Sequence, residues 1–370
     1  MMWEKVRFTD IVQDITGGNM KILNNDYLDE GKYPIIDQGS GLIGGYTNEN
    51  SIVKREKDIV IFGDHTKAIK IIDFDFFIGA YGVKVLQPYD GLDSKFLYYF
   101  LQTIQIPDVG YSRHFKFLKE LQIPLPSLPI QKRIAEILDT ADALRRKDKT
   151  LLKKYDELAQ AIFIDMFGDP LKNEKGWEVK TLGEVCHYIK DGPHVSPKYT
   201  VSGIPFISVN NIIKGQIDLS NCKYISQSDY EMYSKKGKPE KNDILYTKGG
   251  TTGFAKRVDV EFDFVQWVHV ALLKFNQNNL NSVFLEYMLN NTYCYNQSQL
   301  LTKGIANRDL VLGEIKKIKI LFPPVDKQID FEKRVLLLEQ SKKKQIDTIE
   351  KGTNLFNSLL QKAFNGELVS

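Results

Sequence analysis

The feature that most constrains the fold is an apolar heptad repeat that runs from Ile134 until Gly168 without a glycine or proline. Side chains spaced alternately by three and four residues are typical of a coiled-coil helix. The contact positions, which we call the first seam, are Ile134, Ile137, Ala141, Leu144, Asp148, Leu151, Tyr155, Leu158 and Ile162. A helix of about 35 residues is roughly 50 Å long. The sequence therefore predicts an element that is longer than one globular domain needs.

A second helix of the same kind is indicated near the C-terminus. Pro126 and Gln131, which stand at the start of the first repeat, recur 197 residues later as Pro323 and Gln328. The contact positions of the second helix, which we call the second seam, are Val335, Leu338, Ile349, Phe356 and Leu359. Polar or small residues fall on the same line at Lys342, Gln345 and Gly352. Because these residues weaken self-pairing, we expect the second helix to pair with the first.

The repetition extends beyond the two helices. Trp3 corresponds to Trp177, and residues 94–101 correspond to residues 282–289. The chain therefore contains two copies of one unit in tandem, and each copy is a globular domain followed by a long helix. The expected parts are a domain over residues 1–125, a central helix over 126–168, a domain over 169–325 and a final helix over 326–370.

Each globular part has the pattern of a mixed α/β domain with a bias toward strands. Short apolar runs bounded by Gly, Asp or Lys are typical of buried strands. They occur at residues 33–36, 58–62, 68–72, 204–209, 243–247, 264–268 and 269–273. Helical spacing of apolar residues predicts core helices over 94–103 and 282–289. The predicted fold class is α+β, with two repeated domains separated by two long helices.

Composition excludes several classes of protein. The chain has 370 residues, of which 42% are hydrophobic and 26% are charged. No apolar run approaches the roughly 18 residues of a membrane span, so we expect a soluble protein of the cytoplasm. Its three cysteines form no CxxC pair, so neither a disulfide framework nor a zinc site is predicted. The net charge of +3 is small for a protein that binds DNA unaided.

No group of residues has the spacing of a catalytic or metal site. The glycine-rich segment 38–45 lacks the Lys-Ser/Thr pair of a P-loop. The five histidines lack metal-ligand spacing, and Asp64 beside His65 is too little for a catalytic triad. The prolines at Pro323 and Pro324 lack the flanking residues of an amino-methyltransferase motif. The sequence therefore predicts no catalytic residue, no metal and no cofactor held by this chain.

These features in this order resemble the specificity (S) subunits of type I restriction-modification systems. The resemblance covers nearly the whole chain. It lies in the tandem repeat, the helix starts at Pro126 and Pro323, and the strings DQGSGLIGGYT, IVIFGDHTKAIK, DGPHVSP, GIPFISVNNI and NDILYTKGG. It implies two target-recognition domains, each reading half of a bipartite double-stranded DNA target, held apart by an antiparallel pair of helices.

The same resemblance implies partners. Two methyltransferase (M) subunits and the restriction (R) subunits would assemble with this chain, and they would bring S-adenosylmethionine, ATP and Mg²⁺. The assembled complex would be an adenine-specific DNA methyltransferase and ATP-dependent endonuclease. This chain itself would be a non-catalytic specificity subunit.

Loops that follow the predicted strands are the candidate DNA-contacting segments under this resemblance. Arginine pairs with guanine edges and asparagine with adenine edges, while lysine holds phosphates and glycine lets a backbone approach them closely. The candidates are Lys67, Arg113, His114, Lys190, His194, Lys248, Gly249, Gly250, Asn307 and Arg308. Turn and cap roles explain the segment that contains Lys190 and His194 equally well.

Two alternatives stay open. The basic run from Arg145 to Lys154 is typical of a solvated helix face, although it could also dock an M subunit. A two-headed coiled-coil scaffold that binds proteins would use the long helices equally well and would need no DNA specificity. Only the family-like strings argue against that scaffold.

The helix geometry gives a testable prediction about the spacing of the two half-sites. Inserting four residues between Lys149 and Tyr155 lengthens the helix by roughly 6 Å and rotates the residues beyond the insertion by about 400°, a net turn of about 40°. One base pair advances B-DNA by about 3.4 Å and about 35°. We therefore expect the non-specific gap to grow by one base pair while both half-sites keep their sequences, as measured by methylation mapping of the assembled complex.

A seven-residue insertion is the matched comparison. It preserves the heptad pattern, but it adds about 10 Å with almost no net rotation, so it should fit DNA badly. An unchanged gap after the four-residue insertion would show that the helices do not set the spacing.

Overall fold

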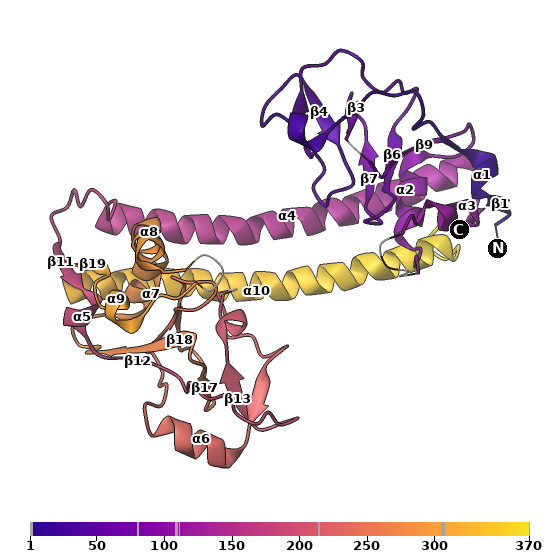
Figure 1. The fold of residues 1–370 in the computed structure, drawn as a ribbon. Coiled ribbons are helices and arrows are strands. Elements are labelled where there is room, and N and C mark those ends of the chain that lie inside the picture. The colour runs from indigo at the N-terminus through magenta and orange to yellow at the C-terminus, as the bar shows by residue number, and fades with distance from the viewer. Residues whose placement is uncertain are drawn as a thin grey trace. The chain divides into compact units, whose positions relative to one another are not determined.

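The computed structural model describes residues 3–79, 81–107, 110, 112–213, 215–304 and 308–369, which fold into two compact units (Figure 1). Unit 1 combines Met1–Leu151 with Gln345–Ser370, and unit 2 is Leu152–Lys344. Each unit thus contains a globular part together with part of each long helix. This division differs from the sequence-based boundaries, because both long helices are shared between the units.

Two uninterrupted helices confirm the predicted long elements. They are α4, Leu128–Phe167, and α10, Val325–Phe364, and each has 40 residues. Gly168, directly after α4, has a φ of +79°, a left-handed conformation that glycine adopts readily and that ends a helix. Gly352 lies within α10 without interrupting it.

The two long helices run antiparallel within each unit. In unit 1, Ile134 near the start of α4 shares a hydrophobic core with Phe356 near the end of α10. In unit 2, Phe163 near the end of α4 contacts Phe331 near the start of α10, with ring centroids 5.5 Å apart. The start of each helix therefore packs against the end of the other.

The first seam requires a correction at three positions. Leu144, Leu151 and Leu158 are exposed, with 59%, 37% and 46% of their surface accessible. The residue after each leucine is less exposed, as Arg145 illustrates. Its guanidinium lies 4.2 Å from the ring centroid of Phe356, and this cation–π contact lets an arginine occupy the seam. Assigning the seam by polarity alone therefore placed these positions one residue too early.

The remaining seam residues face the interior to different degrees. Ile134, Val335 and Phe356 are buried. The partly buried ones are Ile137, Ala141, Tyr155, Ile162, Leu338, Ile349 and Leu359. The two seams thus form the inner faces of the long helices at these positions.

Two polar residues of the second seam pair with residues of α4. In unit 1, Gln345 Nε2 donates to Asp148 Oδ1 at 2.9 Å, and these residues occupy equivalent places in the 197-residue repeat. In unit 2, Lys342 Nζ lies 2.5 Å from Asp156 Oδ1. A polar pair in a helix seam is satisfied in only one alignment of the helices, so the bond between Gln345 and Asp148 favours one register, whereas the Lys342–Asp156 pair is exposed.

Unit 1 contains two four-stranded sheets. The main sheet has the antiparallel order β2-β9-β6-β7, and the second sheet has the order β3-β8-β4-β5 with both parallel and antiparallel pairs. The strands are β1 (Lys5–Arg7), β2 (Val12–Asp14), β3 (Lys21–Ile22), β4 (Tyr33–Ile36), β5 (Gly45–Thr47), β6 (Ile59–Gly63), β7 (Ile69–Ile72), β8 (Phe77–Gly79), β9 (Val83–Pro88) and β10 (Gln122–Pro124). The short helices are α1 (Phe8–Ile11), η1 (Asn24–Asp26), α2 (Ser94–Gln102) and α3 (Phe115–Lys119).

Unit 2 repeats this plan with additions. Its main sheet has the antiparallel order β12-β18-β15-β16, and its second sheet has the order β14-β13-β17. The strands are β11 (Glu178–Thr181), β12 (Cys186–Asp191), β13 (Ile204–Ile207), β14 (Lys223–Ile225), β15 (Ile244–Thr247), β16 (Ala255–Arg257), β17 (Val265–Gln266), β18 (Val270–Phe275) and β19 (Lys319–Phe322). The short helices are α5 (Leu182–Val185), η2 (Val209–Asn211), α6 (Gln227–Ser234), α7 (Ser282–Asn290), α8 (Thr292–Leu301) and α9 (Leu312–Ile315).

One face of each main sheet packs against helices. In unit 1, Val60 of β6 and Phe96 of α2 lie in one core with Phe356 of α10. In unit 2, Ile244 of β15 lies in one core with α7 and with Phe331 of α10. Each globular part is therefore attached to the long helices through its own hydrophobic core.

A buried glutamine joins the long helix of unit 1 to the core helix α2. Gln131 is fully buried, and its Oε1 accepts from the backbone N–H of Asp93 at 2.8 Å. Its Nε2 donates to the carbonyls of Gly91 and Pro126 at 2.9 and 2.8 Å. Asp93 is the N-cap residue of α2, so one amide holds the start of α4 against the start of α2.

Unit 2 builds the same junction with Gln328. Its Oε1 accepts from the backbone N–H of Asn281, the N-cap residue of α7, at 2.8 Å. Its Nε2 donates to the carbonyls of Asn279 and Pro323 at 3.4 and 2.7 Å. The recurring proline and glutamine of the sequence therefore mark a structural junction that occurs twice.

The junction predicts a large loss of stability for one substitution. Replacing Gln131 by Leu leaves the N–H of Asp93 and the carbonyls of Gly91 and Pro126 without this partner. Pro126 is buried, Asp93 is partly buried and Gly91 is exposed, and a buried polar group without a partner costs about 1 to 3 kcal/mol. We expect the free energy of unfolding of unit 1 to fall by about 2 to 4 kcal/mol, as measured by denaturant titration of the full chain. Gln361→Leu, at an exposed position of α10, is the control, and an equal effect of both substitutions would contradict the assignment.

Candidate nucleic-acid interface

One end of the main sheet in unit 1 joins three chain segments. The N–H of Asp64, directly after β6, donates to the carbonyl of Gly82 at 2.6 Å. The carbonyl of Asp64 accepts from the N–H of His114 at 2.8 Å. The Asp64 carboxylate accepts in turn from the N–H of Phe115 at 2.7 Å. We call this place the unit 1 strand-end site.

Unit 2 has the same arrangement after β15. The N–H of Lys248 donates to the carbonyl of His269 at 2.8 Å, and the carbonyl of Lys248 accepts from the N–H of Leu310 at 2.7 Å. Lys248 therefore stands where Asp64 stands in unit 1. We call this place the unit 2 strand-end site. The two sites share their backbone construction and differ in the charge at its centre.

Lys248 is a buried structural group, which corrects its assignment as a phosphate contact. Its surface is only 6% exposed. The ammonium lies 3.0 Å from Asp309 Oδ1 and 3.6 Å from Asp191 Oδ2. Two carboxylates therefore already satisfy the charge, and they tie β12, β15 and the segment before α9 together.

The glycines after Lys248 have different surroundings. A Cβ on Gly249 would clash with Cδ2 of His269, so this glycine permits close packing against an imidazole. Gly250 is exposed, and its N–H donates to the carbonyl of Arg308 at 3.0 Å. Close packing against His269 explains why residue 249 is a glycine, without any phosphate contact. Gly250, by contrast, lies at the surface of the site.

The other cationic candidates of unit 2 are at the surface. Lys190 is exposed, with its ammonium 5.3 Å from the ring centroid of Tyr188. His194 is exposed, and its Nε2 lies 3.3 Å from Asp191 Oδ1. Arg308 is also exposed, while Asn307 lies outside the described residues. The unit 2 strand-end site thus has an ion-paired interior and an exposed cationic surface.

His114 of unit 1 also requires a correction. It is only 1% exposed, and its Nδ1 lies 2.9 Å from the carbonyl oxygen of Asp64. A side chain in this position holds the loop before α3 and is not presented at the surface of unit 1. Arg113, the preceding residue, is exposed and stays a candidate contact.

Sequence reasoning missed the polar residues that border the unit 1 site. Gln38, the second residue after β4, accepts at Oε1 from the N–H of His65 at 3.2 Å and donates from Nε2 to the carbonyl of Tyr81 at 3.2 Å. The Nδ1 atom of His65 lies 3.2 Å from the carbonyl oxygen of Ser112. Tyr81 is 76% exposed. Gln38 and His65 could have been identified from the sequence, because each follows a predicted strand, in the strings DQGSG and FGDHT.

Two ion pairs, one of which contains the buried Lys70, lie on the unit 1 sheet. Burial lowers the pKa of Lys70 below its ordinary value, although Asp37 accepts from its ammonium and opposes the shift. Burial raises the pKa of Asp14, but hydrogen bonds from Lys84, at 2.8 Å, and from Thr16 outweigh burial and hold the pKa below its ordinary value. Both ion pairs therefore rigidify strand ends.

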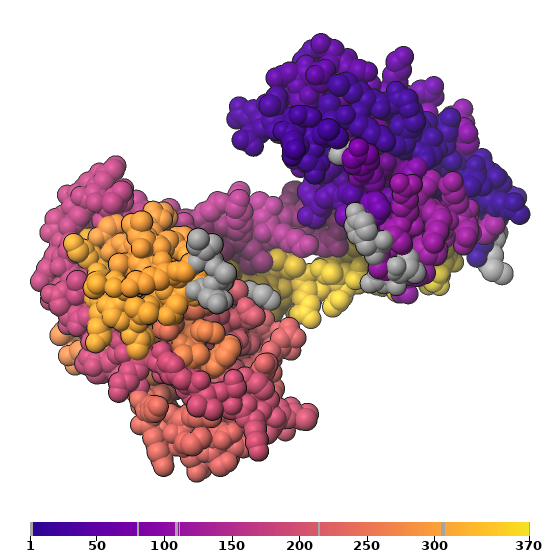
Figure 2. Space-filling model, viewed as in Figure 1, coloured from indigo at the N-terminus to yellow at the C-terminus, as the bar shows by residue number. Residues whose placement is uncertain are grey.

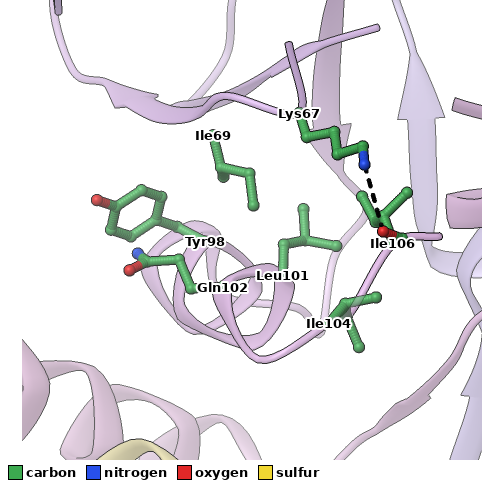
Figure 3. Close-up of a pocket in the computed structure, with 7 residues that line it drawn as sticks. All are labelled: Lys67, Ile69, Tyr98, Leu101, Gln102, Ile104 and Ile106. Atoms are coloured by element: carbon green, nitrogen blue, oxygen red, sulfur yellow. Dashed lines mark hydrogen bonds between the residues drawn. The ribbon is translucent and has the colours of Figure 1, made fainter. Parts of the chain in front are cut away.

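Lys67, another DNA candidate, lies at the edge of a surface pocket of about 370 Å³ (Figure 3). Its φ of +61° is unusual for lysine, and its Nζ donates to the carbonyl of Ile106 at 3.4 Å. The pocket is lined by Lys67, Ile69, Tyr98, Leu101, Gln102, Ile104 and Ile106. The lining combines four aliphatic residues with Lys67, Tyr98 and Gln102, and it contains no carboxylate or histidine.

Neither a metal cluster nor a membrane-spanning helix occurs in the part of the chain that the structure describes. No group of three or more His, Cys, Asp or Glu side chains among those residues could hold a metal ion. None of the described helices is long and apolar enough to cross a membrane.

Comparison with known proteins identifies the family. The family model described as the type I restriction modification DNA specificity domain matches residues 2–154 and 174–351, one match for each copy of the repeat. The chain belongs to this family.

Individual relatives agree with this assignment. The specificity subunit of the type I restriction enzyme MjaIX from Methanocaldococcus jannaschii is 28% identical over 320 residues, which cover 78% of this chain and 72% of that protein. The MjaVIII specificity subunit of the same organism is 23% identical over 401 aligned residues, covering 97% of this chain and 92% of that protein. The crystal structure of an S subunit from M. genitalium shares the fold, with a TM-score of 0.61, 20% identity and coverage of 98% and 96%.

The ion pairs of Lys248 predict a structural effect of its removal. Lys248→Met leaves the largely buried Asp191 and the half-exposed Asp309 facing each other without a cation. We expect the free energy of unfolding of unit 2 to fall by about 1 to 3 kcal/mol, less than for a fully buried pair. Lys190→Met, at an exposed position of β12, is the control in denaturant titrations. Unchanged stability with reduced DNA binding would restore Lys248 as a direct DNA contact.

Proposed function

We propose that this chain is the DNA sequence-specificity subunit of a type I restriction-modification complex and that each unit reads one half of a bipartite target. The observation that carries the proposal is the duplicated strand-end site. The backbone bonds of Asp64 in unit 1 recur at Lys248 in unit 2, while the surrounding side chains differ. Two readers of different half-sites need a common scaffold with different reading groups.

The exposed side chains at these sites have the chemistry of base and phosphate recognition. Arg113 in unit 1 and Arg308 in unit 2 are exposed and close to the centre of each site. A guanidinium can donate two hydrogen bonds to the O6 and N7 acceptors of guanine in the major groove. Lys190 and His194 are placed to contact phosphates, which set the register of a protein on DNA.

Docking of partner subunits on the long helices is part of the proposal. Leu144 and Leu151 in unit 1, and Leu158 and Leu337 in unit 2, expose apolar surface on α4 and α10. Burying this apolar surface against another protein would be favourable. We propose that M subunits cover them and that R subunits join the assembled complex.

The division of chemistry follows from this assembly. This chain would hold no cofactor, while the partner subunits would bind S-adenosylmethionine, ATP and Mg²⁺. The net charge of +3 supports shared DNA binding, because unaided non-specific binding relies on many phosphate contacts. Adenine methylation and ATP-dependent cleavage would belong to the complex, working in the cytoplasm.

A binding experiment separates this function from a protein scaffold. The full chain would be titrated with fluorescent random-sequence duplex DNA, with and without its M subunits. DNA binding that strengthens with M subunits supports a specificity subunit. Absence of DNA binding in both titrations would favour the two-headed coiled-coil scaffold.

The duplicated site predicts modular specificity. Exchanging residues 171–325 for the matching segment of a relative should change one half-site and leave the other intact, because each globular part has its own core. Methylation mapping of a host that carries the exchanged chain measures both half-sites. The reciprocal exchange of residues 1–125 is the control. A change in both half-sites after either exchange would contradict two independent readers.

A further inference from the structure

Arg308 of unit 2 is held at both its backbone and its side chain. Its carbonyl accepts from the N–H of Gly250 at 3.0 Å. Its guanidinium donates from Nη2 to Oε1 of Gln299, on α8. An exposed arginine usually samples many rotamers, so two anchors on one exposed residue suggest a defined position.

Gln299 is itself oriented by the turn after β15. Its Nε2 donates to the carbonyl of Thr252 at 3.0 Å and to Oγ of Ser298 at 2.9 Å. Rotating the amide by 180° would place its oxygen against the Thr252 carbonyl and its NH₂ group against the Arg308 guanidinium. Both contacts would be repulsive, so the network selects one orientation, with Oε1 toward Arg308.

Gly253 permits this close approach of α8. Its φ is +89°, and a Cβ at this position would clash with Oγ of Ser298 and lie 3.1 Å from Nε2 of Gln299. The hydroxyls of Thr252 and Thr302 add a contact of 3.0 Å between the turn and the end of α8. The turn and the helix therefore form one polar network beneath Arg308.

Helix α8 distinguishes unit 2 from unit 1. In unit 2 it lies between α7 and α9, and Figure 2 shows this region (orange) at the molecular surface. In unit 1 the described residues between α2 and α3 contain no helix. Among the described contacts, Arg308 has support of this kind and Arg113 of unit 1 has none.

We propose that Gln299 is a positioning residue that presets the Arg308 guanidinium for reading a guanine edge, which makes α8 a specificity element of unit 2. The proposal rests on the DNA-reading function proposed above. One N–H of the guanidinium is engaged by Gln299, and four others remain in the fork geometry that suits bidentate recognition. Presetting the side chain reduces the conformational freedom that is lost when DNA binds.

The test measures base preference at every position of the target. The full chain with its M subunits would select sequences from a duplex library with a randomised central region. Arg308→Ala should relax the preference at one position of one half-site by about tenfold, the effect of losing one base contact. Gln299→Ala should relax the same position by about three- to tenfold, because an unsupported arginine still carries the reading group.

A double variant separates positioning from an independent contact. If Gln299 acts through Arg308, the Gln299→Ala/Arg308→Ala chain should have the same preferences as Arg308→Ala alone. Additive effects, or a change at a different base position, would overturn the proposal. An unchanged preference in Gln299→Ala would overturn it as well.

Two controls on α8 address helix stability. Asn296→Ala removes an exposed side chain and should leave all preferences unchanged. Gln297→Ala removes the bonds that join α8 to the backbone of Lys319, at 3.0 and 2.9 Å, without touching Arg308. Equal relaxation by Gln297→Ala and Gln299→Ala would assign both to helix docking and overturn the positioning role.

The wild-type chain keeps this inference separate from the proposed function. Selection of a two-part sequence by the wild type supports the function, whatever Gln299→Ala does. If the wild-type chain with its M subunits selects no preferred sequence, the proposed function is contradicted, and the inference about Gln299 is contradicted with it.

Discussion

The structure depends on the buried glutamine junction that occurs once in each unit. Gln131 and Gln328 each bind the backbone N–H of an N-cap residue and two carbonyls, so a single amide fixes a long helix against a core helix. A buried amide with three partners is stable in one geometry and costly in any other, because an unmade bond leaves a desolvated polar group. This directional contact complements the hydrophobic core, which favours burial but tolerates small shifts in packing.

Polar groups also determine how the long helices pair. Leucines alone would allow several alignments of two helices, and the exposed Leu144 and Leu158 show that not every leucine on α4 faces inward. The bond between Gln345 and Asp148 occurs only when equivalent positions of the repeat meet. These two residues occupy equivalent positions of the repeat, so the contact joins the same position of the two long helices. The register of the helix pair therefore aligns equivalent positions of the duplicated sequence.

The sequence predicted the parts of the fold that have a strong local signal. Heptad spacing predicted both 40-residue helices, and the apolar run at Tyr33–Ile36 predicted β4 with its observed bounds. Strand β9 was not predicted, because Lys84 and Gln87 interrupt its apolar residues and the strand is defined by its pairing with β2 and β6. The seam was misplaced at Arg145 for a similar reason, since its contact with an aromatic ring from a distant segment cannot be read from local polarity.

Local sequence was also insufficient to tell which candidate DNA-contacting residues are exposed. His114 and Lys248 are the residue types that contact DNA, and both occur in loops after strands, yet the fold uses them internally. Their partners, Asp64 for one and Asp191 and Asp309 for the other, lie far away in the sequence. The charge of Lys248 is already met by two carboxylates, so this residue contributes to the order of the fold, whereas an exposed cation held by a neutral amide keeps its charge available. Arg308 on Gln299 is of the second kind, and this difference in the neighbouring group, more than the residue type, separates a scaffold residue from a reading residue.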